Sequence, residues 1–288
     1  MADWGKIGSR GNVEDRRSSA PVVAGGISVT GILLYLLVSY LTDGQVSVPL
    51  DTFQPAPQEQ TQNLQEFEGT DEYEVFASTV LGSNNDMWEG KFISGIILDE
   101  NGNKSGGYIP PKLVLFRTAT ESACGVATSQ VGPHYCTLDS TIYLDETFFD
   151  ELTQRYGATG GDVAEAYVMS HEVAHHVQNL MGITDAVSSE IQSNPRVAND
   201  LAMKLELQAD CFAGLWANSI KDLNILSPNE IAEAMDAAAA VGDDRIQEKV
   251  TGRINPETWT HGSSEARVAS FTKGYETGDI ESCDTFSY

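Results

Sequence analysis

Two histidines with a glutamate between them are the residues of this sequence best suited to metal chemistry. They are His171 and His175, with Glu172, in the string HEVAH. The surrounding pattern predicts a helix over 162–181. Residues four apart lie on one helical face, so both imidazoles can bind the same Zn²⁺. Glu172 is offset by about 100° around the helix and can take a proton from a water held by the metal.

Two histidines leave a catalytic zinc site incomplete, because three protein ligands and a water are the usual set. A third histidine on the same helix is excluded, since Gln178 and Met181 stand where that motif needs Gly and His. Glu206 in the string LELQAD is the best candidate for the third ligand. Asp210, one turn later, can accept a hydrogen bond from a ligand histidine and fix its tautomer. The alternatives are two partly buried histidines without a metal, and two acids that face solvent.

Three further histidines lie outside this pattern. His261, in the string THGSS, can donate a hydrogen bond to the oxyanion that forms when water attacks a carbonyl. A capping or core-edge role for His261 fits the sequence equally well. His176 points to a different helical face from His175 and is expected beside the site or at the surface. His134 is expected on a loop.

Periodicity and turn residues predict an α+β fold, mainly helical with a small sheet. Strands are expected at 112–117 and 141–144, and the second could pair with an extended peptide. Asp162 can cap the helix that carries the histidines, and Gly182 can end it. The other helices are expected at 72–92, 147–156, 195–219, 227–242 and 264–276.

Residues 22–41 contain no charged side chain and are mostly apolar. A helix of this length spans about 30 Å, the thickness of the hydrocarbon core of a bilayer. A cleaved signal peptide or a buried core helix are the alternatives, although no small-residue cleavage site follows. Before Lys91, the only basic residues precede this segment, so the positive-inside rule puts the N-terminus in the cytoplasm. These residues are Lys6, Arg10, Arg16 and Arg17.

This interpretation divides the chain into four parts. Residues 1–21 form a cytoplasmic tail, residues 22–41 a transmembrane helix, and residues 42–70 a flexible tether rich in Gln, Glu, Thr and Pro. The metal-binding domain then covers residues 71–288, outside the membrane. The net charge of −25 disfavours nucleic acid as a partner.

All four cysteines lie beyond the expected span, where an oxidising compartment favours disulfides. Cys124 and Cys136 would close a short loop, which leaves Cys211 to pair with Cys283. Free buried thiols are the alternative, and a thiolate ligand from Cys211 is conceivable.

At these residues the chain resembles a bacterial family of neutral zinc metallopeptidases with one N-terminal membrane anchor. The resemblance implies a zincin-like fold, Zn²⁺ on His171, His175 and Glu206, and Glu172 as base. It also implies a location at the bacterial cytoplasmic membrane, and the four cysteines fall where the family has them. The resemblance covers most of the chain and is carried by GNVEDRR (11–17), HEVAHHVQNLMGI (171–183), LELQADCFAGLWA (205–217), VGDDRIQ (241–247) and HGSSEARVASFTKGYETGD (261–279).

The sequence therefore predicts a membrane-anchored zinc peptidase that hydrolyses peptide bonds in a peptide or protein substrate. The rival prediction is a membrane-anchored binding or scaffold module with a structural or vestigial zinc site. Glu172 counts against this rival, because a closed structural site has no use for a base. The sequence does not indicate an oligomeric state.

Overall fold

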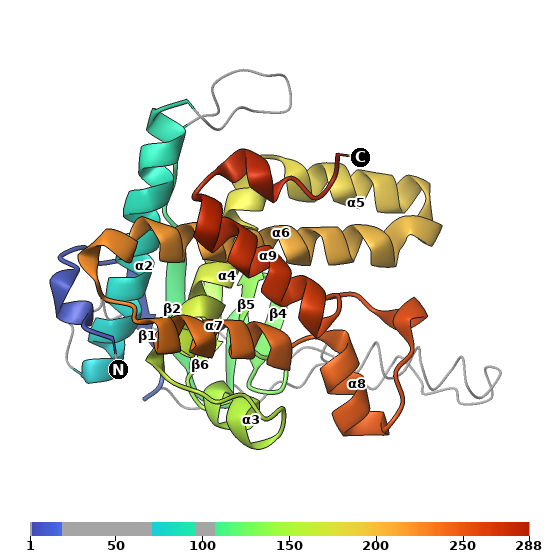
Figure 1. Ribbon diagram of the computed structural model, residues 1–288, viewed down its shortest axis with the longest axis horizontal. Coiled ribbons are helices and arrows are strands. Elements are labelled where there is room, and N and C mark those ends of the chain that lie inside the picture. The colour runs from blue at the N-terminus through green and yellow to red at the C-terminus, as the bar shows by residue number, and fades with distance from the viewer. Residues whose placement is uncertain (1, 19–70, 96–106, 288) are drawn as a thin grey trace, which may run out of the picture.

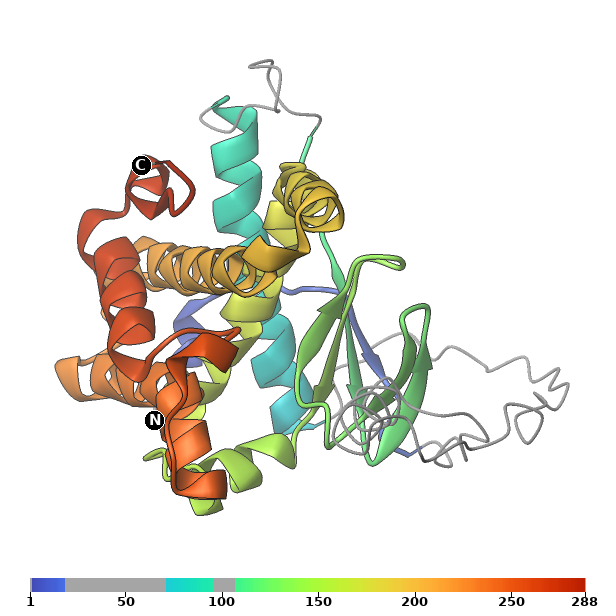
Figure 2. The same ribbon diagram turned by 90° about the vertical axis from the view of Figure 1, so that its right-hand side faces the viewer.

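The computed structural model describes residues 2–18, 71–95 and 107–287 (Figure 1). Over these residues the fold is of the α+β class and mainly helical, as the sequence predicts. Figure 2 shows the helices gathered on one side of the small sheet. The α-helices are α2 (Glu72–Ile93), α3 (Phe148–Gln154), α4 (Asp162–Leu180), α5 (Ile183–Ser193), α6 (Ala198–Ser219), α7 (Pro228–Ala240), α8 (Asp243–Thr251) and α9 (Ser264–Thr277).

The main sheet has the strand order β1-β2-β6-β5, and only β5 runs antiparallel to its neighbour. Strand β6 is an inner strand, so the expectation that this strand pairs with a substrate is wrong. The described edge strands of this sheet are β1 and β5, while β3 and β4 form a separate hairpin. The strands are β1 (Val13–Asp15), β2 (Lys112–Phe116), β3 (Ala119–Ser122), β4 (Gly125–Thr128), β5 (His134–Cys136) and β6 (Thr141–Asp145).

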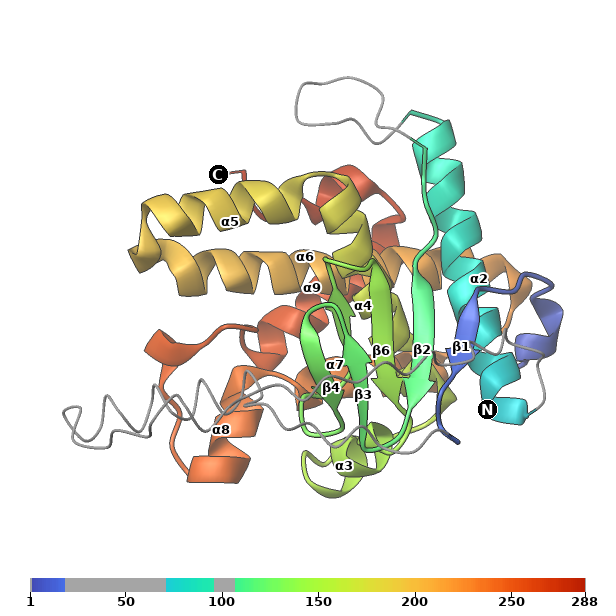
Figure 3. The same cartoon turned by 180° about the vertical axis from the view of Figure 1, so that it is seen from behind.

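Helix α4, which carries both candidate histidine ligands, lies at the centre of the domain. It packs against α6, α7 and α2, and Figure 3 shows it behind the strands. Because most of its circumference is covered, Ala166, Val173 and Val177 are fully buried. Gly182, with φ of 74°, follows the end of α4 as expected, and α5 begins directly after it. The two candidate histidine ligands therefore stand on a helix in the core of the domain.

Two short helices and the cap of α4 differ from the expectation. The sequence did not predict α5 or α8, which are short and exposed along much of their length. The N-cap of α4 is Gly161 instead of Asp162, the first helical residue. The Asp162 carboxylate instead accepts hydrogen bonds from the backbone N–H of Ala2 (2.8 Å) and the indole of Trp4 (2.7 Å). The carboxylate therefore binds the N-terminal segment, while staying favourably placed at the positive end of the helix.

The N-terminal segment, residues 2–18, is part of the folded domain. Strand β1 pairs with β2, and Val13 is fully buried. The N–H of Gly11 donates to the carbonyl of Ser78 on α2 (2.7 Å). On the facing helix, a Cβ at Gly82 would lie 2.6 Å from the backbone nitrogen of Arg10, so glycine is needed there. The described part of the expected tail (1–21) therefore packs on the domain that was expected to begin at residue 71.

Two of the basic residues that suggested a cytoplasmic N-terminus, Arg16 and Arg17, are bound by acidic side chains of the fold. Arg17, whose side chain is 7% exposed, donates to Glu146 (2.7 Å) and to Asp15 (2.9 Å). Arg16 donates to Glu14 (2.6 Å). A single membrane crossing between residues 18 and 71 would require β1 to leave this sheet. No helix within the described ranges is long and apolar enough to cross a membrane, and the predicted span (22–41) and tether (42–70) lie outside those ranges.

Both disulfides have the pairing that the sequence favoured. Cys124 is bonded to Cys136, and Cys211 to Cys283, with sequence separations of 12 and 72 residues. The first bond ties β5 to the end of the β3–β4 hairpin. The second joins the middle of α6 to the 3₁₀ turn at Ile280–Cys283, after α9.

We expect loss of the Cys211–Cys283 bond to cost more stability than loss of the other. The entropy of closing the longer loop corresponds to roughly 4 kcal/mol, against about 3 kcal/mol for the shorter one. Urea unfolding of the paired variants Cys211→Ala/Cys283→Ala and Cys124→Ala/Cys136→Ala measures both losses. A larger loss in the second variant would contradict the expectation.

Candidate metal centre

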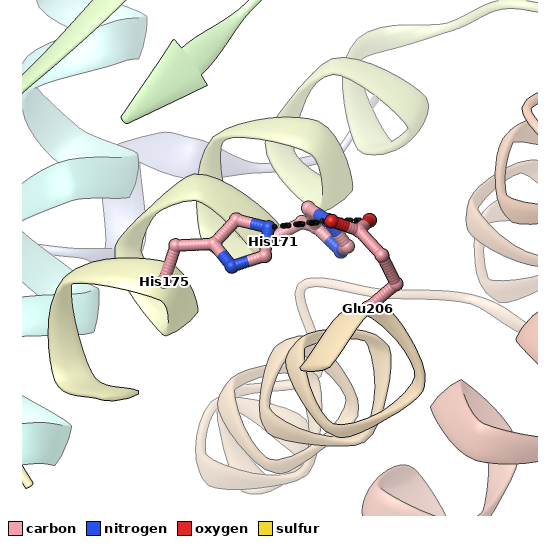
Figure 4. Close-up of side chains that lie close together, drawn as sticks. All are labelled: His171, His175 and Glu206. Carbon is pink, nitrogen blue, oxygen red and sulfur yellow. Dashed lines mark hydrogen bonds and ion pairs between the residues drawn. The ribbon is translucent and has the colours of Figure 1, made fainter. Parts of the chain in front are cut away.

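Three side chains from two helices converge on one point. Nε2 of His175 lies 3.1 Å from Nε2 of His171, and the carboxylate of Glu206 lies 3.2 Å from His171 and 3.4 Å from His175. Figure 4 shows the two rings of α4 and the carboxylate of α6 pointing toward one another. Ligands at zinc distances around a tetrahedral ion stand about 3.3 Å apart, so this group has the size and donor set of a zinc site.

The carboxylate of Asp210 fixes the ring of His171, as the sequence predicts. Asp210 is fully buried, and its Oδ1 lies 2.8 Å from Nδ1 of His171. Burial lowers the pKa of His171, but the charges and hydrogen bonds of Asp210 and Glu206 outweigh burial and raise it to about 10. The Nδ1–H of His171 therefore points to Asp210, which leaves Nε2 directed at the candidate metal position.

The buried amide of Gln178 orients the ring of His175. Nδ1 of His175 lies 2.9 Å from the side-chain oxygen of Gln178. The amide nitrogen of Gln178 donates to the carbonyl of Leu205 (2.8 Å) and to the side chain of Gln208 (3.1 Å), both on α6. These two bonds fix the orientation of the Gln178 amide, so its oxygen faces His175 and accepts a hydrogen bond from Nδ1–H. In the sequence, Gln178 indicates only that the motif with a third histidine is absent, so this contact was not predicted.

The three candidate ligands line a cleft of about 810 Å³. Glu172 lines the same cleft and is only 7% exposed, and it is not one of the three ligands. His261 lines the cleft as well, so the structure brings the expected oxyanion donor to the candidate site. Apolar walls, including Phe148, Val241 and Ile246, complete a space that can take side chains of a peptide.

The loop that carries His261 is held by a carboxylate on α8. Asp243 accepts hydrogen bonds from the backbone N–H groups of Thr260 (2.8 Å), His261 (2.6 Å) and Gly262 (3.0 Å). Its other oxygen lies 3.2 Å from Nδ1 of His261. Although burial raises the pKa of Asp243, these contacts with His261 lower it, so the carboxylate stays charged. A single buried acid therefore fixes both the loop and the histidine ring.

His176 and His134 have structural contacts outside the ligand group. His176 is fully buried, where the sequence suggested a place beside the site or at the surface. Its Nε2 donates to the carbonyl of Ile109 (2.7 Å), and its Nδ1 accepts from the hydroxyl of Tyr135 on β5 (3.0 Å). Burial lowers its pKa, so a neutral ring ties the edge strand to α4. His134 lies in β5 instead of a loop and stacks on Tyr143.

A second group of acids in the described ranges also brings three carboxylates within 4.8 Å of one another. It consists of Asp15, Asp71 and Glu74, at the junction of β1 and α2. The guanidinium of Arg17 contacts all three carboxylates. Because this guanidinium already binds these carboxylates, the group at His171, His175 and Glu206 is the better candidate metal centre.

Comparison with known proteins agrees with this geometry. The profile of the family described as "Putative neutral zinc metallopeptidase" matches residues 2–286. The uncharacterized protein YpfJ of Escherichia coli is 40% identical over an alignment of 290 residues. The alignment covers 96% of this chain and 95% of that protein. The uncharacterized protein Rv2575 of Mycobacterium tuberculosis is 48% identical over 191 residues, 63% of this chain and 64% of that protein.

No solved structure matches this chain significantly. The family match nevertheless spans the N-terminal strand, the ligand helices α4 and α6, and the loop of His261, which the structure joins in one domain. On this evidence the chain belongs to the putative neutral zinc metallopeptidase family.

Proposed function

We propose that the protein is a zinc-dependent peptidase with a zincin-like catalytic domain. The observation that carries this proposal is a ligand group of two histidines and one glutamate beside a cleft that contains an uncommitted carboxylate, Glu172. Three protein ligands with an open position are typical of catalytic zinc, whereas structural zinc sites use four protein ligands. The rival function, a scaffold with a structural zinc, has no supporting observation in the described residues.

The chain supplies the acid–base chemistry and the positioning for hydrolysis. Bound zinc would lower the pKa of water toward about 7 and polarise the scissile carbonyl. Glu172 would take the proton of the attacking water and pass it to the leaving amine. His261, held by Asp243, would donate a hydrogen bond to the developing oxyanion. The substrate would be a peptide or protein segment that enters the cleft in an extended conformation.

The edge strand β5 offers a surface for such a segment. Tyr135 and His134 of β5 line the cleft, and β6 pairs with only one side of this strand. Backbone groups on an edge strand can pair with an added extended peptide. The strand proposed to pair with the substrate is therefore β5, residues 134–136, instead of residues 141–144.

We expect Glu206→Ala to lose stoichiometric zinc. The change removes one of three ligands and leaves the two histidines, so the affinity for zinc should fall by at least about 100-fold. Elemental analysis after dialysis against a weak chelator measures the metal content. Glu190→Ala, on the exposed face of α5, is the matched control and should keep its zinc. An unchanged zinc content in Glu206→Ala would move the third ligand elsewhere.

A further inference from the structure

A buried arginine lies directly behind the candidate metal centre. Arg267, near the start of α9, is only 3% exposed. Its Nε donates to Oδ2 of Asp210 (2.8 Å) and its Nη2 to Oδ1 (2.9 Å), so the guanidinium binds both carboxylate oxygens. Its Nη1 donates to the carbonyl of Val241 (3.3 Å), at the end of α7. The arginine is therefore itself fixed at both ends of its planar group.

Three donors meet on one oxygen of Asp210. The hydroxyl of Tyr167 (2.5 Å), Nδ1 of His171 (2.8 Å) and Nη2 of Arg267 (2.9 Å) all contact Oδ1. A carboxylate bound by His171 alone could rotate about its side-chain torsions. The two parallel bonds from Arg267 fix the plane of the carboxylate, which fixes the direction from which His171 donates.

The close packing of α6 and α9 makes this contact possible. A Cβ at Gly214 would lie 2.1 Å from the carbonyl oxygen of Phe271, and one at Gly274 would lie 1.9 Å from that of Cys211. Glycine at both positions therefore lets the two helices approach closely. With α9 this near, Arg267 reaches Asp210 on α6 although the two residues are 57 positions apart.

We propose that Arg267 is a positioning residue of the metal centre. By holding Asp210 in one orientation, it aims the His171 ring so that Nε2 faces the ligand atoms of His175 and Glu206. This inference rests on the proposed zinc site and adds a residue that acts on a ligand through a second side chain. The partners that orient metal ligands typically change metal affinity 10–100-fold when they are replaced.

A purely structural role for Arg267 leads to a different expectation. A buried ion pair that only packs α9 against α6 affects the stability of the fold and leaves the folded metal site unchanged. The two roles therefore separate when zinc affinity and unfolding are measured on the same variants. The substitution Arg267→Lys is suited to this, because it keeps the positive charge and loses the two-pronged contact.

The full chain is first stripped of metal. Its affinity for added zinc is then measured by competition with a chromophoric chelator. Arg267→Lys should bind zinc at least about 10-fold more weakly than the wild type. Its Co²⁺ form should show an altered visible absorption spectrum, since the ligand geometry changes. Arg267→Gln, which keeps a hydrogen-bonding group without the charge, provides a second variant if the first folds poorly.

The matched control is Arg17→Lys, which alters another arginine held by carboxylates, with a side chain that is 7% exposed and does not line the cleft. It should lower the unfolding midpoint while zinc affinity stays within about twofold of wild type. Wild-type zinc affinity and Co²⁺ spectrum in both folded Arg267 variants would overturn the positioning role. A wild-type chain that binds no zinc would instead overturn the proposed function, and this inference with it.

Discussion

Glu172→Gln is expected to lower the rate of peptide hydrolysis by about 10³-fold or more while the protein keeps its zinc. An amide has nearly the volume of the carboxylate, so the buried position tolerates it, but an amide cannot accept and return a proton. Glu172 is not one of the three converging ligands, so the metal content should stay close to the wild-type value. Cleavage of an unfolded protein substrate and elemental analysis, performed on the same preparation, measure both properties.

Glu165→Gln is the matched control for this experiment. Glu165 lies on the same helix, two turns before the motif, and does not line the cleft. Burial raises its pKa to about 7, so its neutral form is already populated at neutral pH and the amide should be well tolerated. This variant should keep wild-type hydrolysis. If Glu172→Gln cleaves the substrate as fast as this control, Glu172 is not the base.

The convergence of the candidate metal ligands could be predicted because local spacing determines where they point. His171 and His175 lie one turn apart on a helix whose periodicity is clear, and the same holds for Glu206 and Asp210. Only one tertiary contact, between α4 and α6, is needed to join the two pairs. That contact could be inferred because a catalytic zinc site needs a third ligand. The structure brings Glu206 to both histidines.

Apart from Asp210, the residues that support the candidate ligands could not be predicted in this way. Arg267 reaches Asp210 only because two glycines allow α6 and α9 to approach, and no local pattern indicates which helices will be close. Gln178 and Asp243 are ordinary polar residues in sequence, and their importance comes from burial. The segments VGDDRIQ and HGSSEARV were visible as features of the family, but the hydrogen bonds of Asp243 to the His261 loop required coordinates.

The N-terminal segment shows a different limit of sequence reasoning. The positive-inside rule counts basic residues near an apolar stretch and takes no account of their partners. Here Arg16 and Arg17 form ion pairs with Glu14, Asp15 and Glu146, so both cations are bound by carboxylates within the fold. A strand of three residues, such as β1, is also too short to show a pattern of alternation.

We expect Val13→Asp to lower the free energy of unfolding by roughly 3–5 kcal/mol, because it places an unpaired charge in the sheet. Val13 is fully buried between the sheet and the helices, and its backbone is paired with Leu113. Gly8→Ser is the matched control in the same segment, since a Cβ at Gly8 meets no atom within 4 Å. Chemical denaturation of the purified chain measures both variants. An unchanged stability for Val13→Asp would mean that residues 2–18 are not part of the domain in solution.

The same packing makes a prediction for the protein in cells. Because β1 can pair with β2 only when both are in one compartment, the N-terminal segment and the metal centre should lie on the same side of any membrane. Single cysteines at Gly8→Cys and at Ser188→Cys, on the exposed face of α5, report on the two regions. A membrane-impermeant maleimide should label both in intact cells or neither. Labelling of only one position would support a single crossing between them, and β1 would then have to leave the sheet, which the buried Val13 and the ion pairs of Arg17 oppose.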